Sequence, residues 1–164
     1  MDDAAKRPAR LRLILASASP ARHRLLASAG IDPEVTVSGV DEDAVAADLG
    51  EASPAEVALA LARAKAVAVA NDPPPLPEFD EARFDQMAVV GCDSVLELPT
   101  VEEYAGQAIG KPLDAQDAGR RWRLMRGHTG LLHTGHCVVF GQCPGSPDAA
   151  EHRTESAVAT TAVT

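Results

Sequence analysis

The alternation of apolar and polar residues predicts that the chain folds from strands and helices in turn. Residues 13–15 form an apolar run that is typical of a buried strand in an α/β sheet. A Ser-rich turn follows, in which Ser19 is placed as a helix N-cap and Pro20 occupies the first helical turn. Gly30 is expected to end this helix. The segment 11–30 is therefore predicted to be a strand, a turn and a helix.

Two further segments carry signals for where elements begin and end. A second strand is predicted over residues 34–40, and it ends in the acidic cluster 41–43. Ser53 and Glu56 have the spacing of a capping box, so a helix is expected to begin there. The apolar pattern of this helix continues to about residue 70.

The second half of the chain is predicted to begin with a loop and to return to the sheet. Residues 71–86 are acidic and rich in proline, which indicates an exposed loop or insertion and not a domain boundary. A buried strand over 87–92 is expected to end at Asp93 and Ser94. The remaining predicted elements are a helix over 114–125, capped by Asp114, and strands over 131–140 and 157–164.

Length and composition favour a single globular domain. A chain of 164 residues, of which 46% are hydrophobic, is long enough for one α/β domain with its own core, over residues 1–164. The net charge of −9 argues against binding to nucleic acid or to anionic membranes. No apolar run is long enough to span a membrane, and the first residues make a poor signal peptide. Three irregularly spaced cysteines fit reduced cytoplasmic thiols better than disulfides.

Polar residues around the first predicted helix indicate a site for an anion. Arg22 and its basic neighbours lie at a helix N-terminus, which already carries a partial positive charge, so their placement makes most sense with an anion present. Backbone N–H groups, the hydroxyls of Ser17 and Ser19 and the Arg22 guanidinium would together bind phosphate. The alternative is an ordinary helix start with solvated arginines.

Charged residues also follow the other predicted strands, where functional residues of open α/β sheets gather. Asp41 and Glu42 follow the second strand, Asp93 follows the third, and Lys111 lies in the next loop. Carboxylates that hold a metal, and a lysine that neutralises charge beside bound phosphates, form a set suited to phosphoryl chemistry. Each residue also has a plainer interpretation: a solvated loop or an N-cap for 41–43, a turn residue for Asp93, and a surface lysine for Lys111.

Four metal-binding residue types gather near the predicted strand 131–140. They are His128, His133, His136 and Cys137. Their spacing matches no closed structural zinc site. His133 and Cys137 share a face of the predicted strand, whereas His136 points away, so residues of an ordinary strand are favoured over a zinc site.

Several segments occur in the order and spacing of a known family. They are, in chain order, LILASASPARHRLLASAGI, VSGVDED, VALALARAKAVAV, VVGCDSVL, IGKPLDAQDA and MRGHTGLLHTGHCVV. Over about residues 11–164, the chain therefore resembles the Maf family of nucleoside triphosphate pyrophosphatases, also described as septum-formation inhibitors. The resemblance implies an α/β fold similar to that of the inosine-triphosphate pyrophosphatases: an elongated, twisted mixed sheet with flanking helices and two lobes around a central cleft.

The resemblance also implies an activity. Such enzymes hydrolyse a nucleoside triphosphate to the monophosphate and pyrophosphate, and they require a divalent cation, Mg2+ or Mn2+. They are cytoplasmic, are thought to clear non-canonical or excess nucleotides, and are linked to cell-division arrest. Family members often form dimers, so the resemblance allows a homodimer.

Matching motifs assign roles to individual residues. By this resemblance, Asp93 is the general base and, with Glu42, a metal ligand. Ser19 and Arg22 in the SPAR turn would hold phosphates. Lys65 and Lys111 would contact phosphates or order the site.

Two positions depart from the family pattern. Ala21 stands where the family often has Arg or an aromatic residue, and Ser94 stands where its better-defined subgroups have Thr or Gln. Both positions bear on base selection, and the Ser94 hydroxyl favours dTTP or UTP, with 7-methylguanine nucleotides as the alternative. Family members also continue beyond the position at which this chain stops. A non-catalytic nucleotide-binding or division-regulating protein is therefore the alternative to an enzyme.

Overall fold

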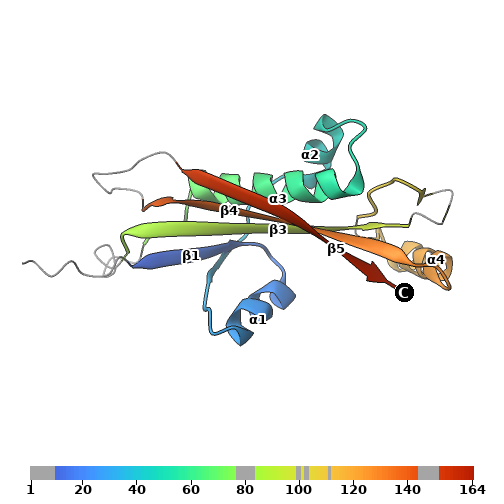
Figure 1. The fold of residues 1–164 in the computed structure, drawn as a ribbon, viewed down its shortest axis with the longest axis horizontal. Helices are drawn as coiled ribbons and strands as arrows, with labels where there is room; N and C mark the ends of the chain where they lie inside the picture. Colours follow the sequence, from blue (N-terminus) through green and yellow to red (C-terminus); the bar gives the residue numbers. More distant parts are fainter. Residues whose placement is uncertain (1–9, 77–83, 99–100, 102–103, 111, 144–151) are drawn as a thin grey trace, which may run out of the picture.

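The computed structural model describes residues 10–76, 84–98, 101, 104–110, 112–143 and 152–164. In this part of the chain, five strands form one mixed sheet in the order β2-β1-β3-β4-β5, together with four helices (Figure 1), so the expected α/β class is confirmed. The strands are β1 (Leu11–Ala16), β2 (Glu34–Thr36), β3 (Gln86–Glu97), β4 (Gly130–Gln142) and β5 (Arg153–Val163). The helices are α1 (Pro20–Ser28), α2 (Glu42–Asp48), α3 (Pro54–Asn71) and α4 (Ala115–Met125).

The long strand β3 is the central strand of the sheet. It pairs in parallel with β1, from Leu11 opposite Gln86 to Ala16 opposite Gly91. It pairs antiparallel with β4 over its whole length. β3 therefore continues to Glu97, beyond the end of β1, and an opening is left beside its second half at the carboxyl end of β1.

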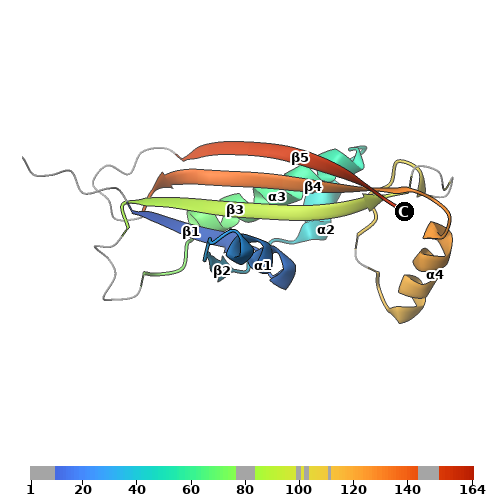
Figure 2. The same ribbon diagram turned by 60° about the horizontal axis from the view of Figure 1, so that its bottom comes forward.

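The helices lie on both faces of this sheet. Figure 1 and Figure 2 show α1 on one face and α3 on the opposite face, with α2 beside α3. The predicted start of α3 is confirmed, because the Ser53 N–H donates to the Glu56 carboxylate (2.8 Å) and the Glu56 N–H donates to the Ser53 hydroxyl. The predicted cap of α4 is confirmed as well, since the Asp114 carboxylate accepts from the Asp117 N–H at 2.8 Å.

A glycine ends helix α1, as its position predicts. Gly30 has a φ of +77° and follows the C-cap residue Ala29. Its N–H donates to the carbonyl oxygen of Ala27 at 3.0 Å. A left-handed backbone at this point favours glycine, so the residue both satisfies a helix-end carbonyl and turns the chain towards β2.

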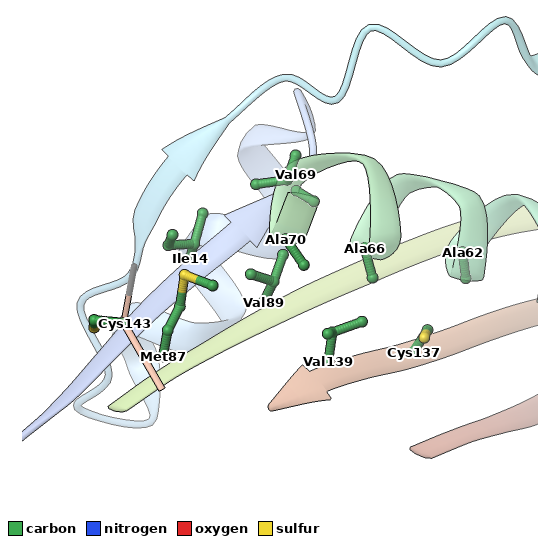
Figure 3. Close-up of a cluster of buried hydrophobic side chains, with 11 residues drawn as sticks. Ile14, Ala62, Ala66, Val69, Ala70, Met87, Val89, Cys137, Val139 and Cys143 are labelled. Atoms are coloured by element: carbon green, nitrogen blue, oxygen red, sulfur yellow. The ribbon is translucent and has the colours of Figure 1, made fainter. Parts of the chain in front are cut away.

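Helix α3 packs on β3 and β4 through small side chains and two glycines. A Cβ atom added at Gly91 would lie 2.1 Å from the carbonyl oxygen of Ala62, and one added at Gly135 would lie 2.2 Å from that of Ala58. The helix and sheet backbones are therefore in direct contact at both positions. Figure 3 shows the core cluster beside this contact. Its buried members are Ile14, Ala16, Ala62, Ala66, Val69, Ala70, Met87, Val89, Cys137, Val139 and Cys143.

The predicted strand 34–40 is wrong beyond its third residue. β2 stops at Thr36, and Gly39 adopts a φ of +65°, which is incompatible with an extended strand. The acidic cluster begins helix α2 instead of ending a strand. Asp41 is the N-cap of α2, and its carboxylate accepts a hydrogen bond from the Ala44 N–H at 3.0 Å.

The predicted strand 87–92 is too short, because Asp93 and Ser94 lie inside β3 and not at its end. The cause is β4, which supplies backbone partners along the whole of β3 after β1 has stopped. β5 likewise begins at Arg153, earlier than expected. The expected loop 71–86 connects the end of α3 to the start of β3, and its residues 77–83 lie outside the described part of the chain.

Among the described residues, no helix has the length and apolar character needed to span a bilayer. Cys92, Cys137 and Cys143 are free, buried thiols, as their irregular spacing predicts.

We expect the substitution Gly91→Ala to destabilise the protein by about 1–3 kcal/mol or more. The new methyl group would meet the backbone oxygen of Ala62 and the backbone nitrogen of Ala66, at 2.1 and 2.7 Å. Urea unfolding followed by circular dichroism measures the change. The control is Gly119→Ala in α4, where the added Cβ meets only the Arg123 side chain at 3.7 Å and the helix gains about 1 kcal/mol. A Gly91→Ala variant as stable as the native chain would contradict the close packing.

Candidate functional site

A polar pocket of about 450 Å³ opens at the carboxyl end of β1. It lies where β1 has ended and β3 continues, so elements from both faces of the sheet reach it. Its lining brings together residues that are distant in sequence and that were predicted as site residues. They are Ser17, Ser19, Arg22, Glu42, Lys65, Asp93 and Ser94.

Lys65 joins two carboxylates on one side of this pocket. Its Nζ lies 2.5 Å from Oδ1 of Asp93 and 2.8 Å from Oε1 of Glu42. Asp93 faces α3 because alternate residues of β3 share a face, and Gly91 on that face contacts the same helix. Glu42 arrives from the first turn of α2. Three elements thus place one cation between two acids.

The ammonium group of Lys65 keeps its charge at neutral pH. Burial alone lowers the pKa of this group, but hydrogen bonds and charge interactions with Asp93 and Glu42 outweigh the burial, and the net pKa is raised. The side chains of Lys65 and Asp93 are only 10% and 12% exposed, whereas that of Glu42 is 43% exposed. The pair Lys65 and Asp93 is therefore the fixed part of the cluster, and Glu42 is its solvent-facing part.

Arg22 occupies the other side of the pocket and is held by hydroxyl groups. Its Nη1 donates to Oγ of Ser17 at 3.1 Å, and its Nη2 donates to Oγ of Ser94 at 3.2 Å. The Ser17 hydroxyl also accepts the N–H of Ser19 at 3.2 Å, which fixes the turn between β1 and α1. The predicted grouping of Ser17, Ser19 and Arg22 at one helix start is present in the structure.

The two cations approach β3 from opposite faces. Asp93 and Ser94 are neighbours in this strand, so their side chains point to opposite sides of the sheet. Asp93 meets Lys65 from α3, and Ser94 meets Arg22 from α1. The two faces of the sheet are joined by the pocket around the end of β1, where Ala16 is part of the lining.

Ser19 is the N-cap residue of α1, but its side chain makes no capping hydrogen bond, and the Ser17 hydroxyl binds the Ser19 N–H instead. Lys111, predicted to contact the phosphates or to order the site, lies outside the described part of the chain. Its neighbour Gly110 accepts a hydrogen bond from Nη1 of Arg121 at 2.7 Å through its carbonyl oxygen.

The zinc alternative finds no support in the structure. His133 lies between Glu97, at 2.9 Å from its Nε2, and Thr160, at 3.0 Å from its Nδ1. His136 contacts the Cys92 sulfur, and Cys137 is fully buried in the core. Across the described residues, no three side chains of His, Cys, Asp or Glu are grouped as a metal site.

Thr134 is a neighbour of the site that sequence reasoning missed. It lies on β4 directly opposite Ser94, and the two hydroxyl oxygens are 3.1 Å apart. Only the antiparallel register of β3 and β4 brings them together, so no local signal marks Thr134. Val37 and Ser38 also line the pocket, from the segment after β2.

The acidic side chains have the chemistry to bind a hard divalent cation. The oxygens of Glu42 and Asp93 converge on one point, the ammonium nitrogen of Lys65. Mg2+ in proteins is commonly held by one or two carboxylates, with waters and substrate phosphates completing its coordination. Two converging carboxylates, across the pocket from Arg22, fit that kind of site, and they do not form a closed cage by themselves.

Comparison with known proteins relates this pocket to a family. The chain is 48% identical over 154 residues to a protein of Streptomyces avermitilis and 50% identical over 154 residues to one of Streptomyces coelicolor. Each match covers 94% of this chain and 62% of the relative. A protein of Salinispora tropica is 47% identical and is covered over 57% of its length, with 93% of this chain aligned. All three relatives are named nucleoside triphosphate pyrophosphatase.

The relatives are longer than this chain, as the resemblance led us to expect, since the chain spans 57–62% of their length. The model of the Maf-like protein family matches residues 12–164, which include all seven predicted site residues that line the pocket. On this match, the chain belongs to the Maf-like protein family.

Proposed function

We propose that this chain is a metal-dependent nucleoside triphosphate pyrophosphatase, which hydrolyses its substrate to the nucleoside monophosphate and pyrophosphate. The single observation that carries the proposal is the Lys65 cluster, with Asp93 and Glu42 both bound to one ammonium group, across the pocket from Arg22. The names of the Streptomyces relatives point to the same reaction.

The triphosphate would lie between the two cations. Within the described part of the chain, Arg22 donates two of the five N–H groups of its guanidinium to Ser17 and Ser94, and the other donors of the fork would bind phosphate oxygens. The N-terminus of α1 adds backbone N–H groups and partial positive charge on the same side. From the other side, Lys65 would contribute its charge to the phosphates or order the carboxylates.

Glu42 and Asp93 would hold the divalent cation, Mg2+ or Mn2+. When bound, such an ion polarises phosphate oxygens and neutralises charge that develops on them. Glu42 is suited to this part because its side chain is partly exposed and can turn towards an incoming ion. Asp93 has a fixed position, since Lys65 binds its Oδ1.

The reaction needs one proton acceptor. Water adds to a phosphorus of the α–β anhydride, the bridging P–O bond breaks, and pyrophosphate leaves with the electron pair of that bond. Asp93 would accept the proton of the attacking water, and Lys65 would hold the Asp93 carboxylate in position. Lys111, which follows Gly110, would contact the phosphates, and the Ser94 hydroxyl would favour dTTP or UTP as substrate.

We expect Asp93→Asn to lower kcat at least about 100-fold, because it removes the proton acceptor while keeping the shape of the side chain. The assay is pyrophosphate release from dTTP, UTP, CTP, GTP and 7-methyl-GTP with Mg2+ or Mn2+. Asp32→Asn is the matched control, since the Asp32 side chain is 99% exposed and is not part of the pocket lining. Unchanged turnover in Asp93→Asn would overturn its role. A folded native chain that binds nucleotide without turnover would instead be a non-catalytic nucleotide-binding protein.

Glu42→Gln tests the metal site without any need for turnover. We expect this variant to bind Mn2+ at least about tenfold more weakly, because a direct carboxylate ligand becomes a neutral amide and even outer residues of metal sites matter by that factor. Electron paramagnetic resonance of free Mn2+ during a titration measures the affinity. Glu155→Gln on β5 removes an exposed carboxylate of the same type and should leave the affinity unchanged. Equal Mn2+ binding in both variants would place the ion elsewhere.

A further inference from the structure

The guanidinium of Arg22 differs from other arginines of the chain in what holds it. Arg12, Arg121 and Arg153 each pair with a carboxylate at 2.6–2.7 Å. Within the described residues, by contrast, the polar partners of Arg22 are the hydroxyls of Ser17 and Ser94. A hydroxyl can orient a guanidinium without cancelling its charge, whereas a carboxylate would compete with an incoming phosphate. Among the described residues, the guanidinium of Arg22 is therefore held in position by hydroxyls that do not neutralise its positive charge, which can still attract a phosphate.

The Ser94 hydroxyl can hold Arg22 only if its own direction is fixed. Oγ of Ser94 accepts from Nη2 of Arg22 and lies 3.1 Å from Oγ1 of Thr134. A serine side chain otherwise turns freely among three staggered rotamers. When Ser94 exchanges a hydrogen bond with Thr134, its oxygen is kept in place and a lone pair remains directed at Arg22.

Thr134 is a stiff anchor for this arrangement. It is β-branched, which restricts its χ1 angle, and it sits within β4, between β3 and β5. Its paired residue on β5 is Ala159, which has no hydroxyl that could compete with Ser94 for the Thr134 hydroxyl. Thr134 does not line the pocket, so any effect on a ligand must pass through Ser94 and Arg22.

We propose that Thr134 is a positioning residue for phosphate binding: its hydroxyl fixes Ser94, which in turn holds the Arg22 guanidinium towards the pocket. This inference rests on the proposed function, in that a polyphosphate is taken to be the ligand of the pocket. By this inference, a residue of β4 affects the affinity for substrate, although β4 contributes no residue to the pocket lining.

The test replaces Thr134 by valine, which keeps the branched shape and removes the hydroxyl. We expect KM for the preferred nucleotide to rise about 3- to 10-fold, the effect of losing one intramolecular hydrogen bond, while kcat changes less than about twofold. Thr134→Ser retains the hydroxyl and is expected to restore the native KM. Thr161→Val on β5 is the matched control, with the same chemical change at an exposed position outside the pocket lining.

A binding measurement separates this inference from the proposed function. Calorimetric titration with Mg2+-saturated inorganic tripolyphosphate measures binding without catalysis. In Thr134→Val we expect the affinity for tripolyphosphate to fall about 3- to 10-fold, the effect of losing one hydrogen bond. A native chain that binds tripolyphosphate but releases no pyrophosphate would refute the pyrophosphatase, and Thr134 would still be tested by affinity. Unchanged affinity in Thr134→Val, or equal losses in the Val and Ser variants, would overturn the role of the hydroxyl. A native chain that does not bind tripolyphosphate would overturn it too.

A double-mutant comparison shows whether the effect passes through Ser94. If it does, adding Thr134→Val to a Ser94→Ala variant weakens tripolyphosphate binding no further, because the hydroxyl that Thr134 holds is already gone. Fully additive losses in the double variant would mean that Thr134 acts by another route, and the proposal would fail. Urea midpoints equal to that of the native chain confirm that each variant is folded.

Discussion

The direct contact between helix α3 and strand β3 is the constraint on which the rest of the structure depends. At Gly91 the strand leaves no room for even a Cβ atom beneath Ala62. Lys65 lies one residue before Ala66 on that helix, and Asp93 lies two residues after Gly91 on that strand. The contact that packs the core therefore also sets the distance between the ammonium and carboxylate groups. A larger residue at position 91 would push both apart.

Charge at the site is arranged by the same close packing. Buried charges are tolerated when they are paired and hydrogen-bonded, and the bonds to Lys65 satisfy this condition for Asp93. One lysine between two carboxylates leaves this side of the pocket negative, which suits a divalent cation. Arg22, on the other side, is oriented by hydroxyls and stays positive, which suits a polyanion. The pocket thus offers adjacent places for the two components of a metal–nucleotide complex.

Local signals in the sequence predict local features of the fold. The capping residues Ser53 and Asp114 and the terminating Gly30 act on backbone groups three residues away or fewer, and all three do so in the structure. Strand lengths are predicted less accurately than helix ends, because the extent of a strand depends on its partner strands. Asp93 was expected at the end of a strand, yet β4 continues to supply hydrogen bonds past it to Glu97.

The sequence by itself determined the α/β class, the starts of α1, α3 and α4 and the family. From the residues of the first turn, and through the family resemblance, it also named seven residues that line one pocket. These follow from patterns within short segments, where neighbouring residues interact directly along the chain. Only the tertiary structure decided that Lys65 joins Asp93 to Glu42, that the two cations approach from opposite faces, and that Thr134 holds Ser94. In the sequence, Lys65 lies 23 residues from Glu42 and 28 residues from Asp93, and Ser94 lies 40 residues from Thr134. Sheet register and helix packing bring them together, and neither is encoded in any single segment.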